Sequence, residues 1–402
     1  MEHTGAFPVG ATVTRAELAA DPHPALARLR AAEPVSWVPD LGCWLVTSHA
    51  AALRVLRDPR TFTVDDPRFS TARVVGPSML SLDGPAHAAA RRPFAGPFRP
   101  AEVADRFTTR ITELAAELVG AIRPAGRAEL RASVAGPLAV RVVAEALGLT
   151  VDPATVLRWY STFVTAVSEV TAGGAVPAEA TAAFAALAED LRAGTARDGS
   201  VLADAAAGGL GEVAVVSNAA VLLFGGIETT EGMILNALWH LLRDPGLLAA
   251  VREDLDQDLD LLPRAVEESL RLEPAAAVVD RYATRDVELA GTPIGRGDPV
   301  TVSLAGANRD PTAFPDPDAF DLRRAGAPRH LAFAHGPHAC LAMDLARLET
   351  QIAVRTVLVE LPDLRLDEPV RPTGLVFRKP RRLPVRWRPA HPRSSPSIAS
   401  GE

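Results

Sequence analysis

A single long apolar stretch in the second half of the chain limits the folds open to it. Residues 213–242 keep a helical pattern without a proline, and the stretch ends at Asp244-Pro245. Thirty residues at about 1.5 Å each span roughly 45 Å, which is long enough to cross a whole domain. The first part is apolar enough for a membrane span, but Glu228 and Glu231 would then lie inside the bilayer. We therefore expect a buried central helix in a mainly helical protein.

Short strand signals accompany the helices. The sequences VSWV at 35–38 and CWLV at 43–46 flank the turn-forming Pro39-Asp40-Leu41-Gly42, and together they predict a β-hairpin. Residues 58–85 are rich in Asp, Pro, Ser and Gly and predict an extended, loop-dominated segment. Gly173-Gly174 and the nearby proline predict a movable corner between helices.

No repeat and no linker-like stretch divides the chain. We therefore expect one domain over residues 1–389. The remaining residues, 390–402, are rich in proline and serine and predict a disordered tail. The N-terminal sequence MEHTGAFPVG lacks the pattern of a secretion signal, so we expect a cytoplasmic protein.

Charge and rare residues exclude several classes of function. Lys+Arg 42 minus Asp+Glu 49 gives a net charge of −7, which argues against a nucleic-acid-binding protein. Lys379 is the single lysine, and its place between Arg378 and Pro380 makes a Schiff-base enzyme or a phosphate-loop NTPase improbable. Two cysteines, Cys43 and Cys340, cannot form a disulfide framework, and their rarity favours a reducing compartment.

Cys340 follows a segment with the composition of a loop, HLAFAHGPHA, and precedes a helical stripe at Leu341, Leu345 and Leu348. We therefore expect Cys340 at a helix N-terminus, where unpaired N–H groups and the helix dipole stabilise negative charge. Such a position lowers the pKa of a thiol and favours the thiolate, which is the form that binds metals.

Three interpretations of Cys340 compete. A buried structural cysteine is the default for a lone cysteine, but it would not require this loop of Gly, Pro and His. Zinc binding by His335, His338 and Cys340 lacks the second cysteine pair of structural zinc sites and has poor spacing. Axial ligation of haem iron needs one thiolate, and this interpretation fits the sequence.

The loop resembles the cysteine-ligand signature of the cytochrome P450 family, Phe-Gly-x-Gly-x-His-x-Cys-x-Gly. The matching residues are Phe333, Gly336, His338 and Cys340, followed by a family-like LARLE at 345–349. Two signature glycines are replaced by Ala334 and Ala342. Ala342 is expected within the helix, where alanine is favourable, whereas Ala334 is costly if its backbone needs a positive φ. The resemblance implies that Cys340 is the axial iron ligand of haem b, iron protoporphyrin IX.

Glu268 and Arg271 match the family's Glu-x-x-Arg motif, and their i,i+3 spacing places both charges on one helix face. Alone, this pattern is common and usually marks a solvent-exposed pair. The family adds an arginine from a later Pro-x-Arg-Phe element, but Ala319 stands in that place here. We expect Arg323 or water to complete the triad.

The resemblance implies four donors for the two haem propionates: His87, Arg91, Arg281 and His338. His87 and Arg91 lie i,i+4, so they point the same way from one helix. Arginine is also well suited to bind a carboxylate. Standing alone, His87 and Arg91 would be interpreted as a surface pair. The matches occur in the family's order between residues 83 and 349, which makes coincidence improbable.

Gly225-Gly226 lies in the middle of the long stretch, immediately before Ile227-Glu228-Thr229. Each glycine in a helix costs about 1 kcal/mol relative to alanine. The two glycines therefore indicate the close approach of either a neighbouring helix or a flat ligand. The segment resembles the family's oxygen-binding groove over the distal face of the haem. The resemblance assigns the hydroxyl of Thr229 to hydrogen bonding with dioxygen, and assigns Glu228 a part in proton delivery.

The resemblance implies a mainly α fold with a small β portion, in one triangular domain with the haem between the long helix and the Cys340 helix. It implies a monooxygenase that uses O₂ and NAD(P)H electrons to hydroxylate or epoxidise an organic substrate. With two cysteines, the chain has no room for its own electron-transfer domain, so a separate ferredoxin and ferredoxin reductase are expected. One alternative is an oxidase that couples or cyclises its substrate. A haem-thiolate sensor is another, but Glu228 and Thr229 argue against it.

By resemblance, five regions form the substrate pocket: 69–82, 156–177, 225–229, 275–279 and 375–377. Their side chains are mostly small or apolar, which predicts a largely hydrophobic substrate. The Ala- and Arg-rich, Lys-poor composition is typical of a GC-rich genome and favours a role in natural-product biosynthesis. Neither a nucleic acid nor a membrane is expected as a partner.

Overall fold

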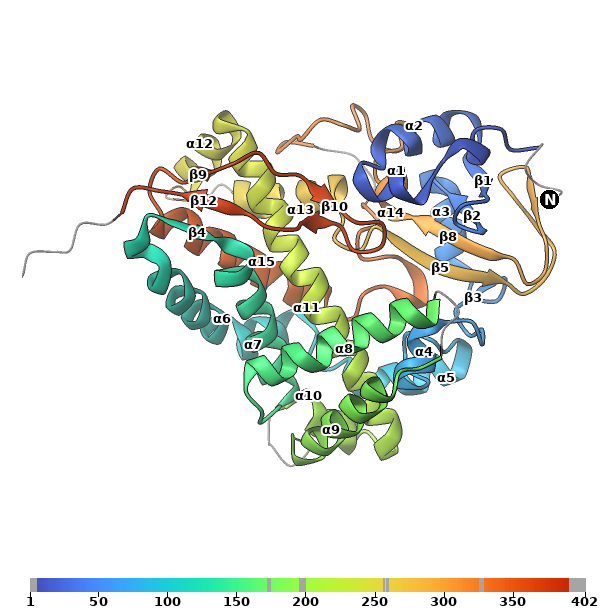
Figure 1. Cartoon of the computed structure of the whole chain (residues 1–402), viewed down its shortest axis with the longest axis horizontal. Coiled ribbons are helices and arrows are strands. Elements are labelled where there is room, and N and C mark those ends of the chain that lie inside the picture. Colours follow the sequence, from blue (N-terminus) through green and yellow to red (C-terminus); the bar gives the residue numbers. More distant parts are fainter. Residues whose placement is uncertain are drawn as a thin grey trace, which may run out of the picture.

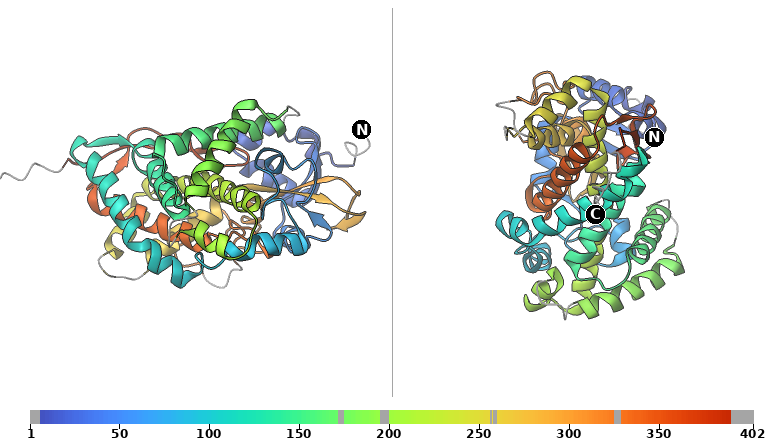
Figure 2. Two further views of the ribbon diagram at one scale, coloured as in Figure 1. Left: turned by 90° about the horizontal axis from the view of Figure 1, so that it is seen from below. Right: turned by 90° about the vertical axis from the view of Figure 1, so that its left-hand side faces the viewer.

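The computed structural model describes residues 6–171, 175–194, 200–255, 257, 260–324 and 329–389. Helices form most of it, and the largest sheet lies at one end with the N-terminal helices (Figures 1 and 2). The α-helices are α1 (Arg15–Ala20), α2 (His23–Ala32), α3 (His49–Arg57), α4 (Ser70–Val75), α5 (Gly84–Arg91), α6 (Pro100–Ile122), α7 (Gly136–Leu147), α8 (Pro153–Thr171), α9 (Ala178–Gly194), α10 (Val201–Ala207), α11 (Glu212–Arg243), α12 (Pro245–Asp254), α13 (Leu261–Leu272), α14 (Leu304–Ala307) and α15 (Met343–Glu360).

The largest sheet has five strands in the order β1-β2-β8-β5-β3. Its strands are β1 (Val35–Val38), β2 (Cys43–Val46), β3 (Phe62–Thr63), β5 (Val278–Ala283) and β8 (Pro299–Ser303). β1 and β2 form the predicted hairpin, with Val35 opposite Val46. Gly42 in the turn has a φ of 67°, which glycine adopts without steric cost. β2 continues the sheet by pairing in parallel with β8.

The other strands form small antiparallel sheets. Two of these bring the end of the described chain against the helical part of the molecule, one beside the π-helical turn η4 (Arg131–Ala135) and one beside α11. The strands are β4 (Arg127–Glu129), β12 (Pro384–Arg386) and β9 (Arg365–Leu366) in one sheet, β6 (Val287–Leu289) and β7 (Thr292–Ile294) in a second, and β10 (Pro372–Thr373) and β11 (Lys379–Pro380) in a third.

The predicted central helix is confirmed as α11, which runs through the helical part and packs against α7, α13 and α15 (Figure 1). It ends at Arg243, and the Asp244 side chain then accepts hydrogen bonds from the N–H groups of Gly246 and Leu247, both at 3.0 Å, to cap α12. By length and composition, α11 is apolar enough to cross a membrane. It is instead the core of the helical part, and its residues from Thr230 to Leu242 are all buried.

The segment 58–85, predicted as mainly loop, also contains β3, the short helix α4 and the start of α5. The predicted corner at Gly173-Gly174 and the predicted tail, 390–402, lie outside the described residues.

Candidate active site

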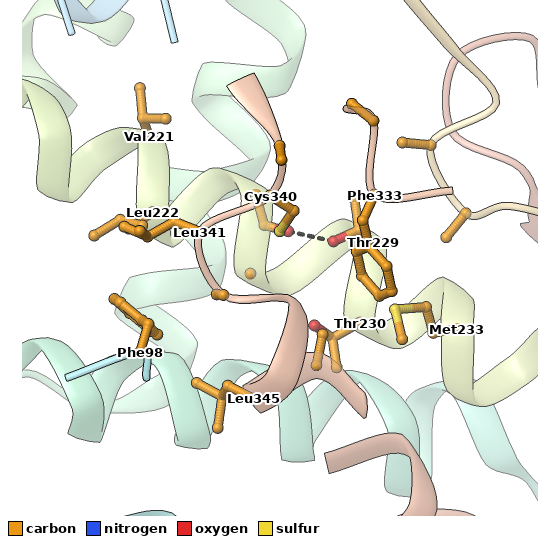
Figure 3. A pocket seen from close by; sticks show the side chains of 18 of the residues that line it. Phe98, Val221, Leu222, Thr229, Thr230, Met233, Phe333, Cys340, Leu341 and Leu345 are labelled. Carbon is orange, nitrogen blue, oxygen red and sulfur yellow. Dashed lines mark hydrogen bonds between the residues drawn. The ribbon is translucent and has the colours of Figure 1, made fainter. Parts of the chain in front are cut away.

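A largely apolar cavity lies beside the middle of α11 (Figure 3). Thr229 of α11 and Cys340, from the loop before α15, line the same cavity. The apolar lining comes from distant parts of the chain and includes Phe98, Val221, Leu222, Met233, Phe333, Leu341 and Leu345. A partly buried thiol and a hydroxyl therefore face a space that otherwise offers little hydrogen bonding.

One hydrogen bond and one glycine fix the conformation of the loop that carries Cys340. The N–H of Cys340 donates to the carbonyl oxygen of Phe333 at 2.9 Å, which folds the loop back on itself. Gly336 has a φ of 74°, and a Cβ there would stand 2.4 Å from the carbonyl oxygen of Leu56. No other residue fits that position, because a side chain would collide with the backbone of α3. Cys340 lies three residues before Met343, the first residue of α15.

The two alanines that replace signature glycines differ in their backbone. Ala334 has a φ of 55°, in the left-handed region where a Cβ costs roughly 1–2 kcal/mol. Ala342 has a φ of −96°. It lies immediately before α15, whereas the prediction placed it within the helix. The replacement at Ala334 is therefore strained, and the replacement at Ala342 is not.

The predicted lowering of the Cys340 pKa is wrong for the polypeptide by itself. Burial raises the pKa of the Cys340 thiol, and it outweighs the N–H of Ala342 and the charge of Arg91, which act in the opposite direction. A metal ion bound to sulfur reverses this balance, because coordination deprotonates a thiol. Burial also raises the pKa of Cys43, to about 11, and this cysteine lies in the β-hairpin as a structural residue.

A pair of histidines lies beside the cavity. The rings of His87 and His338 are in contact, with centroids 4.3 Å apart, and Nε2 of His338 is 2.8 Å from Oδ1 of Asp83. Within the described part of the chain, Nε2 of His87 is buried without a hydrogen-bond partner. Burial, with help from His338 and Arg91, lowers the pKa of His87 to about 4. Sequence analysis missed Asp83, which fixes the orientation of His338.

Two arginines complete the predicted donor set. Arg91 lines the cavity, and its Nη2 donates to the carbonyl oxygen of Ala339 at 2.7 Å. The Arg281 side chain is buried, and its Nη1 donates to the carbonyl oxygen of Asp280 at 2.7 Å. Burial lowers the pKa of Arg281 to about 10. Asp83 and Asp280 act on the Arg281 guanidinium through their charge, but it forms no ion pair among the described residues, so the carboxylate of a ligand would be its first direct ion-pair partner.

The Glu-x-x-Arg pair forms a buried ion-pair network, as the family resemblance implies. Arg271 donates to both carboxylate oxygens of Glu268, at 2.9 and 2.8 Å. The third partner is Arg324, whose Nε lies 2.9 Å from Oε1 of Glu268. The expectation of Arg323 is wrong, because its side chain is exposed. Arg324 reaches Glu268 because the chain between them curls back, so that Arg324 also bonds the carbonyl oxygen of Ala319 at 3.0 Å.

The two adjacent glycines in the middle of α11 have different surroundings. A Cβ at Gly226 would stand 3.0 Å from Cγ2 of Val143, so this glycine allows α11 to pack closely on α7. A Cβ at Gly225 would meet no atom of the described residues within 4 Å, and both glycines line the cavity. The hydroxyl of Thr229 donates to the Gly225 carbonyl oxygen at 2.5 Å, the dashed line in Figure 3. Helix packing therefore accounts for Gly226, whereas Gly225 opens onto the cavity.

Glu228 does not line the cavity with Thr229. Its carboxylate accepts a hydrogen bond from the hydroxyl of Tyr160 on α8, and its Oε1 lies 2.7 Å from Nζ of Lys379. Sequence analysis missed both partners. The signal that could have identified Lys379 is that it is the single lysine of the chain, a rarity that served only to exclude enzyme classes.

The cavity draws on three of the five regions predicted for the substrate pocket. Met79, Leu80, Ala275, Ala276 and Val279 line it together with the α11 residues. None of the described residues in 156–177 and 375–377 does so. Phe98 and residues of α7 take their place, namely Val142, Val143, Ala146 and Leu147.

The zinc interpretation of the loop gains no support. Within the described ranges, no group of three or more His, Cys, Asp or Glu side chains is arranged to hold a metal ion. His335 instead contacts the guanidinium of Arg57, at 3.3 Å. A single sulfur ligand therefore fits the loop better than a cluster.

Comparison with known proteins decides between the remaining interpretations. The family model described as Cytochrome P450 matches residues 200–362, which include α11, the Glu-x-x-Arg pair and Cys340. The chain is 38% identical over 397 residues to Cytochrome P450 monooxygenase PikC of Streptomyces venezuelae, covering 92% of each protein. The chain belongs to the cytochrome P450 family. This cytochrome P450 is also 37% identical over 381 residues to mycinamicin IV hydroxylase/epoxidase of Micromonospora griseorubida, covering 89% of the chain and 94% of the relative.

The structure agrees with these matches. The crystal structure of P450BioI in complex with an acyl carrier protein superposes with a TM-score of 0.83 at 29% identity, covering 93% of this chain and all of the other. The predicted mainly helical cytochrome P450 fold is therefore confirmed, and this chain is a cytochrome P450 monooxygenase.

Membership of the family implies a haem with a thiolate ligand, and the residues of the cavity fit one. The partly buried thiol of Cys340 lies in the wall of an apolar space. Among the described residues, His87 has a buried nitrogen without a hydrogen-bond partner, and the buried Arg281 forms no ion pair at contact distance with a carboxylate. These are the groups that a flat apolar ligand with carboxylates at its edge would satisfy.

Proposed function

We propose that this cytochrome P450 inserts one oxygen atom from O₂ into a largely hydrophobic natural product, by hydroxylation or epoxidation. The observation that carries the proposal is the shared apolar cavity of Cys340 and Thr229. The similarity to the mycinamicin IV hydroxylase/epoxidase supports the substrate class. For hydroxylation, the substrate C–H bond, O₂, two electrons and two protons yield the alcohol and one water.

Each side chain of the site has a proposed task. Cys340 would ligate the haem b iron, and His87, Arg91, Arg281 and His338 would bind its propionates. A bound haem with a thiolate ligand supplies electron density that favours cleavage of the O–O bond. The apolar wall excludes bulk water and holds the substrate. Thr229 would hold a proton at its cavity-facing hydroxyl, and Glu228 would supply protons to that position.

The electrons would come from NAD(P)H through a ferredoxin reductase and a ferredoxin. Arg92 is exposed and follows Arg91, which lies near Cys340, so it offers a positive charge to an acidic ferredoxin. The catalytic unit would be residues 1–389, working in the cytoplasm. Neither a nucleic acid nor a membrane enters the proposal.

Replacing Thr229 by alanine tests the proposal. In the loaded enzyme, Thr229→Ala should keep substrate affinity and NAD(P)H consumption but release more hydrogen peroxide. Product per NAD(P)H should fall, by at most about 10²–10⁴-fold, because a misplaced proton donor costs that much in general acid catalysis. Thr229→Ser retains the hydroxyl and serves as the control. A Thr229→Ala enzyme with unchanged product yield would show that the hydroxyl serves only the Gly225 carbonyl, as helix threonines often do.

The substrate class is tested separately. Macrolactones and other apolar natural products should shift the visible spectrum of the loaded enzyme on binding, and turnover should give a product heavier by one oxygen atom. A product that has lost two hydrogens without gaining oxygen would instead identify the coupling or cyclising alternative. Binding without turnover in the presence of reduced ferredoxin would identify a sensor.

A further inference from the structure

Lys379 is the single lysine in the 402-residue chain, and it is buried. It lies in β11, which packs beside α11, and its side chain is 8% exposed. A lysine carries a compact charge on a flexible stem, whereas the guanidinium of arginine is a wide planar fork. Burying an ammonium costs free energy unless carboxylates surround it. The groups around Lys379 therefore indicate what its charge does in the fold.

The Lys379 ammonium joins two glutamates of α11. Its Nζ lies 2.7 Å from Oε1 of Glu228 and 2.6 Å from Oε1 of Glu231. The two glutamates are three residues apart, so they lie on one face of the helix. Two carboxylates this close repel each other, and the ammonium between them offsets that repulsion.

Each glutamate has a second partner from another part of the fold. The hydroxyl of Tyr160 on α8 donates a hydrogen bond to Glu228. Arg131 is the first residue of the π-helical turn η4 (Arg131–Ala135), and its Nε lies 2.6 Å from Oε1 of Glu231. Burial and the charge of Glu228 raise the pKa of the Tyr160 phenol, so Tyr160 remains a donor. We call Tyr160, Glu228, Lys379, Glu231 and Arg131 the α11 charge cluster.

A third glycine of α11, Gly232, lies beside this cluster. A Cβ at Gly232 would stand 2.9 Å from Cβ of Ala275 and 3.6 Å from Cδ of Lys379. Gly232 therefore allows the segment at Ala275 to pack closely on α11, and the stem of Lys379 lies beside it at ordinary van der Waals distance. Thr229 follows Glu228 in the sequence and faces the cavity, so the cluster and the cavity share one turn of α11.

We propose that Lys379 is a positioning residue for proton delivery. It holds the Glu228 carboxylate against Tyr160, one residue from the cavity, and thereby sets how many electrons end in product rather than in hydrogen peroxide. This inference rests on the proposed function of the site, in which Glu228 supplies the protons.

The first test needs no turnover. Incorporation of ¹³Cε-lysine places one lysine signal in the whole holoprotein, because the chain has one lysine. Glu228→Gln and Glu231→Gln should each move that signal. Glu253→Gln, at an exposed position of α12, should leave it in place. A signal that is insensitive to Glu228→Gln would overturn the contact on which the proposal depends.

The second test measures coupling in the holoenzyme. Lys379→Met keeps most of the stem and removes the charge. It should retain the thiolate-type spectrum of the reduced CO complex and substrate affinity, while product per NAD(P)H falls by about tenfold or more and peroxide rises. Lys379→Arg keeps the charge but puts a wide planar guanidinium in its place, so its coupling should lie between that of Lys379→Met and that of the wild type. Arg378→Met is the matched control, because Arg378 is a buried cation of the same segment that binds Glu273 at 2.6 Å.

A double variant separates positioning from folding. Lys379→Met combined with Glu231→Gln removes one charge of each sign and leaves Arg131 to balance Glu228. Coupling should stay low in this variant, because Glu228 still lacks its anchor. Normal coupling in Lys379→Met, or a loss no larger than that of Arg378→Met, would overturn the role of Lys379. A wild-type enzyme that oxygenates no substrate that it binds would instead overturn the proposed function.

Discussion

Removing Arg324 should destabilise the protein by about 2–3 kcal/mol of the free energy of unfolding. Its guanidinium donates to Glu268 at 2.9 Å and to the carbonyl oxygens of Pro315, Asp316 and Ala319, at 2.5, 3.2 and 3.0 Å. A hydrogen bond to a charged group contributes about 1.5–3 kcal/mol, and breaking a buried ion pair outright costs about 3–5 kcal/mol. The loss of unfolding free energy in Arg324→Ala should be smaller than about 3–5 kcal/mol, because Arg271 still donates two hydrogen bonds to Glu268.

Arg323→Ala is the matched control, since the adjacent side chain is exposed and its loss should change the free energy of unfolding by less than about 0.5 kcal/mol. Urea unfolding of the holoprotein, followed both by circular dichroism and by the Soret band, measures the difference from the midpoints and slopes. Equal losses for Arg324→Ala and Arg323→Ala, or a larger loss for the latter, would refute the assignment of Arg324 as the third member of the triad.

Three further predictions concern the Cys340 loop and the helix after it. Cys340→Ala should abolish the thiolate-type Soret band of the reduced CO complex, whereas Cys43→Ser should keep it; the same band in both variants would exclude Cys340 as the ligand. Ala334→Gly should raise the free energy of unfolding by about 1 kcal/mol because it relieves the positive φ, and Ala342→Gly should lower it, as urea unfolding will show. Burial raises the pKa of Glu349 from its ordinary value near 4.5 to about 8, so its contribution to stability is complete below pH 4.5 and is lost as the pH rises through 8. Glu349→Gln should flatten that decline, and an unchanged slope of urea midpoint against pH between 5 and 8 would contradict it.

The sequence by itself determined the features that depend on residues near one another in the chain. The central helix was predicted over 213–242 and spans Glu212–Arg243, because apolar periodicity and a terminal Asp-Pro are local signals. The hairpin and the Glu268–Arg271 pair were predictable for the same reason. The strain at Ala334 was predicted for the case that its backbone has a positive φ, since glycine normally fills this signature position.

Only the tertiary structure decided which distant groups meet. Arg324 lies 56 residues from Glu268, and Asp83 lies 255 residues from His338, so no spacing rule could pair them. Lys379 reaches Glu228 because β11 returns to the side of α11. The pKa of Cys340 was predicted in the wrong direction because the helix-end signal is local, whereas the desolvation that outweighs it comes from every element packed around the sulfur.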